Sequence, residues 1–239
     1  MKEIYQMDST NALFTRTEMM LGAETLRRMA AARVILFGVG GVGSWCAEAL
    51  IRSGVGHLTL VDSDCIEPTN INRQLPALST TVGIPKVAVM RDRLLAVNPQ
   101  ADIVARQERY TPESAECFDL QSFDYVVDAI DSLKDKLNLI LRATQLGVRF
   151  YSSMGAARKL DPLQVQVSEF WKVNGCPLAA TLRKRMRKAG TYPGGRFLCV
   201  WSPERNEQSQ PKGTLMPVTA TFGLTLASLI IRDIAQQQV

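Results

Sequence analysis

The sequence predicts an α/β fold built on a mostly parallel sheet, and two observations support this. Short apolar runs alternate with amphipathic stretches of helical length between residues 34 and 152. Such alternation is typical of parallel βαβ units with right-handed crossovers. A glycine-rich turn follows the first apolar run directly. The chain has 239 residues and 46% apolar content, which is enough for one substantial core. We therefore expect a single domain over residues 1–239.

The first 152 residues contain five mostly apolar runs of strand length, which is the pattern of buried parallel strands. The predicted strands are residues 34–37, 57–61, 103–105, 123–127 and 148–152. Between them, apolar residues recur every three or four positions, which predicts helices at 45–51, 85–97 and 133–146. The second helix is expected to end at Asn98-Pro99 because proline cannot continue a helix.

The C-terminal part predicts an antiparallel extension with flanking helices. Leu163, Val165 and Val167 alternate with polar residues, and residues 196–201 form another apolar run, so both segments are predicted strands. Helices are predicted at 177–189 and 218–234, and residues 202–213 read as a polar surface loop. The apolar stretch 222–231 is interrupted by Thr and Ser and is shorter than the roughly 20 residues that span a bilayer. We therefore expect a buried or dimer-facing helix and no membrane span.

Charge and cysteine usage narrow the function classes. The net charge of +5 and pI near 9.0 favour an anionic partner, and RNA fits this balance. The five cysteines are odd in number, without a CxxC pair, and no N-terminal signal sequence precedes them, which predicts a reduced, cytoplasmic protein without zinc. The single histidine, His57, excludes His-based metal clusters. It stands just before an apolar run, and we interpret it as a strand-edge residue.

A GxGxxG turn made by Gly38, Gly40, Gly41 and Gly43 predicts a phosphate-binding loop, because missing side chains let backbone N–H groups approach an anion. Asp62, about 20 residues further on, is placed to bind ribose hydroxyls, with Asp64 beside it. By itself this pattern of a Rossmann-like fold fits NAD, FAD or ATP equally.

The residues that follow favour ATP and nucleotidyl transfer. Asn70, Arg73, Gln74 and Lys86 are polar groups for which the spectator pyrophosphate of a dehydrogenase has no evident need. Arg73 and Lys86 would neutralise the charge that builds on the α-phosphate and the departing pyrophosphate. The alternative is that each is a solvated surface cation.

Two aspartates, Asp128 and Asp131, flank the end of the strand at 123–127, where ligands bind in open α/β sheets. We assign Mg²⁺ to Asp131, because Mg²⁺ is usually held by one or two carboxylates together with phosphate oxygens. The alternative is that Asp131 or Ser132 is the N-cap of the next helix.

A basic run lies on the predicted helix 177–189, whose apolar positions Leu178, Leu182 and Met186 would face inward. The outward cations are either a solvated face or contacts to RNA phosphates. They are Arg183, Lys184, Arg185, Arg187 and Lys188.

Together these motifs resemble the ThiF/MoeB-like, ubiquitin-activating-enzyme-like adenylating superfamily. The resemblance implies that Asp62 binds ribose, that Asn70, Arg73 and Lys86 contact phosphates, and that Asp131 serves Mg²⁺. It implies a homodimer in which Arg16 reaches the partner's nucleotide. Residues 1–153 would bind the nucleotide, and residues 154–239 the substrate and the second subunit.

Within that superfamily the chain is most similar to the tRNA threonylcarbamoyladenosine dehydratases. The similarity is carried by the segments 43–45, 52–56, 161–162, 177–179 with 182–183, and 201–204. It implies ATP-dependent cyclisation of threonylcarbamoyladenosine beside the anticodon, through a carboxyl-adenylate, with release of AMP and pyrophosphate. The implied partners are the tRNA anticodon arm and a sulfur-transfer protein.

Three other functions remain open. A sulfur-carrier or ubiquitin-like protein adenylyltransferase would use Cys176 or Cys199 as nucleophile, although members of that group typically carry two CxxC zinc pairs, which this chain lacks. A nicotinamide-dependent oxidoreductase and a non-catalytic nucleotide-binding adaptor are the others. The chain departs from the dehydratase pattern at Cys176, where an acidic or polar residue is expected, and in the short segment 202–214.

Overall fold

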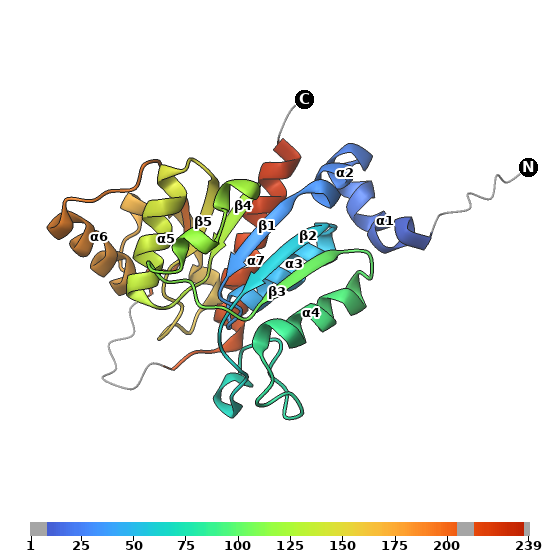
Figure 1. Ribbon diagram of the computed structural model, residues 1–239, viewed down its shortest axis with the longest axis horizontal. Helices are drawn as coiled ribbons and strands as arrows, with labels where there is room; N and C mark the ends of the chain where they lie inside the picture. The colour runs from blue at the N-terminus through green and yellow to red at the C-terminus, as the bar shows by residue number, and fades with distance from the viewer. Residues whose placement is uncertain (1–8, 205–212, 237–239) are drawn as a thin grey trace, which may run out of the picture.

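The computed structural model describes residues 9–204 and 213–236 and is built around a seven-stranded sheet (Figure 1). The strand order is β3-β2-β1-β4-β5-β7-β6. All neighbouring pairs are parallel except β6 with β7, which are antiparallel. The strands are β1 (Arg33–Phe37), β2 (His57–Val61), β3 (Asp102–Arg106), β4 (Tyr125–Asp128), β5 (Arg149–Ser153), β6 (Gln166–Glu169) and β7 (Leu198–Trp201). The predicted α/β fold with an antiparallel C-terminal extension is confirmed.

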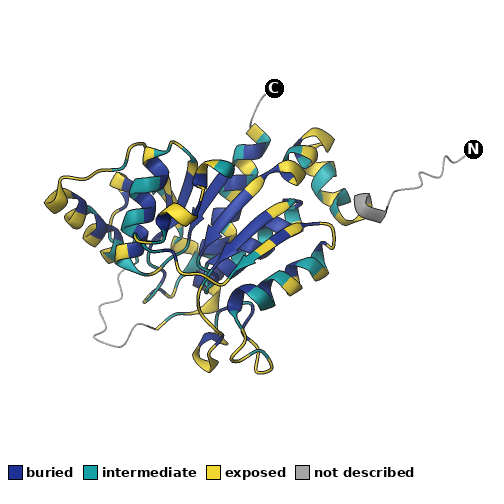
Figure 2. Ribbon diagram, viewed as in Figure 1, coloured by how far each residue is buried: buried dark blue, intermediate teal, exposed yellow. Residues whose placement is uncertain are grey.

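Helices cover both faces of the sheet, so the central strands have no solvent-exposed face (Figure 2). They are α1 (Ser9–Leu21), α2 (Ala23–Ala31), α3 (Gly43–Ser53), α4 (Lys86–Val97), α5 (Leu133–Gln145), α6 (Pro177–Ala189) and α7 (Met216–Gln236). Val34 and Leu36 pack with α2, α3, α4 and α7, whereas Ile35 and Phe37 pack with α5 and α6. This alternation along β1 divides the interior into two cores, because successive side chains of a strand point to opposite faces.

Helix α7 is, within the described part of the chain, the one helix long and apolar enough to cross a membrane by length and composition. Its residues Val218, Phe222, Leu226 and Ile230 are buried in the core shared with α3. Gly223 allows this contact, because a Cβ there would overlap the carbonyl oxygen of Val42. The prediction of a buried helix is confirmed for this face of α7.

Two features of the fold differ from the sequence predictions. Helices α1 and α2 were not predicted. The predicted strand at 163–167 is wrong over its first part, because Pro162–Gln164 is a 3₁₀ turn and the strand begins at Gln166. Asp161 accepts a hydrogen bond from the Leu163 amide at 2.8 Å, which stabilises the turn and leaves the Leu163 side chain 92% exposed. The predicted loop at 202–213 lies largely outside the described residues.

Candidate functional site

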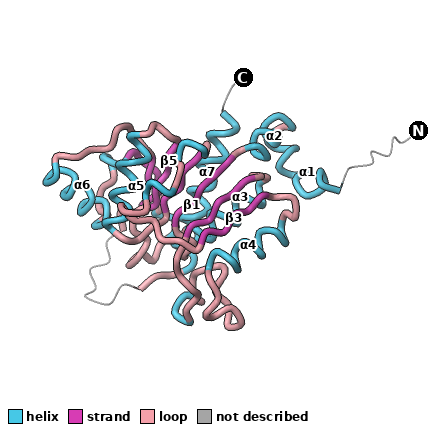
Figure 3. Tube along the Cα trace, viewed as in Figure 1, coloured by secondary structure: helices cyan, strands magenta, loops and turns pink. Residues whose placement is uncertain are grey.

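A cavity of about 1180 Å³ lies at the carboxyl ends of the central strands, where loops gather at one end of the sheet (Figure 3). The loops after β1, β2, β3, β4 and β5 all contribute to its lining. In the strand order, β1 stands between β2 and β4, so the connections from β1 and β4 leave in opposite directions. Such a switch point is where open α/β sheets bind ligands. The volume exceeds the usual range of about 300–1,000 Å³ for one small ligand.

The glycine turn between β1 and α3 forms one wall of the cavity. Gly38 has φ +91°, and a Cβ there would lie 2.7 Å from the carbonyl oxygen of Ala129. A Cβ on Gly43 would overlap the Gly38 carbonyl oxygen. These two glycines are therefore required by the tight turn itself, because no side chain fits. Gly40 and Gly41 line the cavity, where missing side chains leave room for a phosphate.

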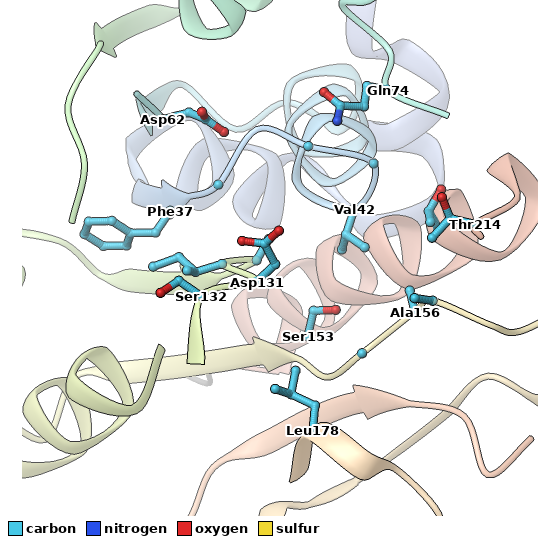
Figure 4. Close-up of a pocket in the computed structure, with 18 of the residues that line it drawn as sticks. Phe37, Val42, Asp62, Gln74, Asp131, Ser132, Ser153, Ala156, Leu178 and Thr214 are labelled. Atoms are coloured by element: carbon cyan, nitrogen blue, oxygen red, sulfur yellow. The ribbon is translucent and has the colours of Figure 1, made fainter. Parts of the chain in front are cut away.

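Asp62 connects the end of β2 to this turn. Its carboxylate accepts hydrogen bonds from the Val39 amide at 2.7 Å and from the Asp64 amide at 2.9 Å. Burial raises the pKa of Asp62, and the positive charge of Lys86 and these two amides act in the opposite direction. Figure 4 shows its side chain beside the cavity, as the predicted ribose contact requires.

Lys86, the first residue of α4, is almost fully buried and lines the cavity. Its Nζ donates to Asp64 at 2.8 Å, and this hydrogen bond is the main cause of the lowered Asp64 pKa. The Asp64 side chain is 64% exposed, so the pair lies at the cavity mouth rather than in the core. The lysine is held in place by a partner that an incoming phosphate could replace.

The segment after β2 contributes Arg73 and Gln74 to the cavity but not Asn70. Arg73 is half-buried and donates to the Thr69 carbonyl and the Asn72 side chain, both at 2.9 Å. Gln74 is buried, and its Oε1 has no hydrogen-bond partner within the described residues. Asn70 instead accepts a hydrogen bond from the Glu67 amide at 3.1 Å, which closes the 3₁₀ turn Pro68–Asn70 that precedes Arg73.

The two aspartates at the end of β4 and in the loop after it, Asp128 and Asp131, lie in different environments. Asp131 lines the cavity, and Figure 4 shows its carboxylate directed into it between Asp62 and Ser153. Within the described residues it forms no hydrogen bond or ion pair. An uncommitted carboxylate that faces the cavity is chemically suited to hold Mg²⁺. Ser132, not Asp131, is the N-cap residue of α5.

Asp128 does not line the cavity. Its side chain is fully buried and accepts hydrogen bonds at 2.6 Å from both Lys136 Nζ and Ser152 Oγ. Lys136 is equally buried and also donates to the Ser153 carbonyl at 2.9 Å. The predicted nucleotide contact of Asp128 is therefore replaced in this structure by an internal ion pair that joins β4, β5 and α5.

Several cavity residues were missed by the sequence analysis. Arg109, after β3, lines the cavity and pairs with Asp135 at 2.9 Å, which raises the Arg109 pKa. Its position four residues after the predicted strand 103–105 was the available signal, because polar residues in the loops at the carboxyl ends of parallel strands reach the ligand edge.

The far side of the cavity, here called the acceptor half, consists of residues 153–159, 176–178, 181 and 213–214. It follows β5 and includes the start of α6. Cys176 is buried there, and Cys199 lies fully in the core, where burial raises its thiol pKa well above the usual value. Neither thiol has the exposure that a nucleophilic cysteine needs.

The remaining candidate residues lie outside the cavity. Arg16 is exposed on α1 and does not line the cavity of its own chain. On α6, Arg183 donates to the Phe170 carbonyl at 2.9 Å, and Arg187 lies over the Trp171 ring. Of the basic run, Lys184, Arg185 and Lys188 are exposed and form no ion pair within the described residues. His57 is the first residue of β2 and lies 3.3 Å from the exposed carboxylate of Asp102, so its position at the end of a strand is confirmed.

Comparison with known proteins gives a consistent result. The model of the ThiF family matches residues 14–238. The tRNA threonylcarbamoyladenosine dehydratase of Bacillus subtilis is 42% identical over 181 residues, covering 76% of this chain and 71% of the relative. Crystal structures of the Escherichia coli tRNA N6-threonylcarbamoyladenosine dehydratase in complex with ATP and with AMP superpose with TM-scores of 0.89 and 0.88, at 35% identity and 94% coverage of both chains.

Proposed function

The chain belongs to the ThiF family, and from that premise we propose that it is an ATP-dependent tRNA threonylcarbamoyladenosine dehydratase. The observation that carries the proposal is one cavity with two differently lined halves. The glycine turn, Asp62, Arg73 and Lys86 line one side, and the acceptor half lines the other. A site in which a second substrate reacts with ATP needs room and binding groups for both molecules, and the two halves of the cavity provide them.

The nucleotide side of the cavity places positive charge near the phosphates, where the reaction develops negative charge. Asp62 binds the ribose, and the turn amides and α3 N-terminus hold the phosphates. Arg73 and Lys86 neutralise the charge that grows on the α-phosphate and pyrophosphate, a contribution typically worth about 3–4 kcal/mol per well-placed donor. Asp131 would hold Mg²⁺, which would supply positive charge that neutralises the phosphate oxygens.

The reaction has two steps. The threonyl carboxylate of the modified adenosine attacks the ATP α-phosphate, the bond to pyrophosphate breaks, and a carboxyl-adenylate forms. The neighbouring carbamoyl group then attacks the activated carbonyl, AMP leaves, and a ring closes. Because both groups belong to one nucleoside, the second step has a high effective concentration. No cysteine takes part, which agrees with the burial of Cys176 and Cys199.

The tRNA is proposed to meet α6, which adjoins the acceptor half. Lys184, Arg185 and Lys188 are exposed cations suited to phosphate contacts. Replacing Lys184 and Arg185 with glutamate is expected to weaken tRNA binding while ATP affinity stays unchanged. Equal loss of both affinities, or of neither, would contradict this assignment.

A homodimer completes the proposal, with Arg16 of each subunit serving the other's nucleotide. Its support is that Arg16 is exposed and does not reach the cavity of its own chain. We place the protein in the cytoplasm, because its five cysteines are all free, as in a reducing compartment.

The test is a single-turnover incubation with ATP, Mg²⁺ and threonylcarbamoylated tRNA, followed by mass analysis of the nucleosides. The expected product is lighter than the substrate nucleoside by one water, with AMP and pyrophosphate formed in step. An unchanged nucleoside would refute the proposed substrate. A sulfur-carrier protein with a C-terminal Gly-Gly tail is the second substrate to offer in the same assay.

A further inference from the structure

The acceptor half contains a buried lysine, Lys159, that is not among the residues assigned to ATP. Lys159 follows the loop after β5, lines the cavity, and is only 6% exposed. Its Nζ donates to the Glu204 carbonyl oxygen at 2.6 Å. Within residues 9–204 and 213–236, no carboxylate oxygen lies within ion-pairing distance of it. An ammonium group is costly to bury without a counter-charge, so its retention beside a cavity calls for a ligand.

The nearest carboxylate is directed elsewhere. Glu204 accepts hydrogen bonds from the backbone amides of Leu160 and Asp161 at 2.9 and 3.0 Å. It therefore fixes the loop that carries Lys159 and leaves its ammonium group without a direct carboxylate contact. Burial lowers the pKa of Lys159, and the nearby Cys176 and Glu204 act in the opposite direction. The lysine therefore lines the cavity with its Nζ bonded to a neutral carbonyl and not to a carboxylate.

The N-terminus of helix α6 lines the same half of the cavity and is a second source of positive potential. Helix α6 has 13 residues and begins at Pro177, and its N-cap residue, Cys176, makes no side-chain cap hydrogen bond. The first bonded amide of the helix is that of Ala180, which donates to the Cys176 carbonyl. Leu178 at this N-terminus lies against the 153–156 loop, since a Cβ on Gly155 would be 3.6 Å from Leu178 Cβ (Figure 4). Helix N-termini attract anions.

We propose that Lys159, with the N-terminus of α6, binds the free carboxylate of the substrate's threonyl group and so selects the modified adenosine. This inference rests on the proposed function. The carboxylate is the one anionic group that distinguishes the modified nucleoside from ordinary adenosine, and recognition must occur in the same cavity as ATP. Lys159 would hold one carboxylate oxygen and leave the other free to attack the α-phosphate.

An RNA phosphate offers the same chemistry as a carboxylate, so the experiment separates the two. Binding is measured without ATP, for three tRNAs: threonylcarbamoylated, unmodified, and a carboxamide form in which the threonyl carboxylate is amidated. The proteins are the wild type, Lys159→Met, which keeps the length of the side chain, and Lys134→Met as control. Lys134 has a 64% exposed side chain paired with exposed Glu113 and does not line the cavity.

The wild type is expected to prefer the threonylcarbamoylated tRNA over the other two by about ten- to a hundredfold, the usual range for a hydrogen-bonded charge. Lys159→Met should lose that preference while its affinities for unmodified tRNA and for ATP stay within about twofold of wild type. The Lys134→Met protein should match the wild type.

Three results would overturn the inference. Equal weakening of all three tRNAs by Lys159→Met would indicate a phosphate contact. An unchanged preference would remove Lys159 from recognition. Equal binding of the carboxylate and carboxamide tRNAs by the wild type refutes the inference without any variant, so a misfolded Lys159→Met protein leaves the test intact. Failure of the wild type to dehydrate the modified tRNA would refute the proposed function instead.

Discussion

The buried pair of Asp128 and Lys136 gives the sharpest test of the structure, because it replaces a predicted nucleotide contact with an internal one. Both side chains are 0% exposed and 2.6 Å apart. Lys136→Met removes the ammonium group but keeps an unbranched apolar side chain, which leaves the Asp128 carboxylate uncompensated in the core. Breaking a buried pair in this way costs about 3–5 kcal/mol of unfolding free energy.

The assay is urea unfolding at one fixed protein concentration, for Lys136→Met, Asp128→Asn and the double variant. Because the double variant leaves no unpaired charge, it should recover about 2 kcal/mol or more relative to the sum of the single losses. Lys134→Met is the matched control on the same helix, and its exposed pair should contribute no more than about 1 kcal/mol. ATP affinity of the double variant should equal that of the wild type.

Two results would refute this reasoning. If Lys136→Met costs no more than Lys134→Met, the pair is not the buried structural contact described above. If the double variant is stable but binds ATP at least about tenfold more weakly, Asp128 serves the nucleotide after all.

Three further predictions concern the nucleotide side of the cavity. Gly40→Ala should keep a near-wild-type unfolding midpoint, since its Cβ would be 3.8 Å from Gln74 Nε2. Calorimetry should nevertheless show ATP binding weakened about tenfold or more, because the methyl group occupies phosphate space. The lowered Asp64 pKa means that its bond to Lys86 stabilises the fold above about pH 3.8 and that this contribution is lost as pH falls through the lower folded value. Lys86→Met should therefore flatten the acid limb of unfolding free energy against pH, and an unchanged limb would contradict the assignment. Mixing Arg16→Ala with Lys86→Ala subunits should restore part of the turnover that each lacks alone, whereas no recovery would place Arg16 outside the partner's site.

Much of the nucleotide side could be predicted because its residues are positioned locally. Gly38 and Gly43 are required by a tight strand-to-helix turn, and such a requirement is visible in a single short motif. Asp62 directly follows a parallel strand, and all such strand ends meet at one edge of the sheet. The family resemblance assigned Asn70 to phosphate, but its side chain instead accepts a hydrogen bond within the turn that precedes Arg73.

The sequence by itself therefore determined the sheet, the glycine turn and the residues at the ends of its strands, because hydrophobic period and turn chemistry are local properties. The tertiary structure alone decided which polar groups face the cavity. Asp128 and Asp131 are three residues apart, yet only the first meets a buried lysine from α5. Lys159 is positioned by the carbonyl of Glu204, and it shares its part of the cavity with the start of α6; both segments are distant from Lys159 in the chain. Burial and charge compensation depend on such long-range packing, which no local pattern encodes.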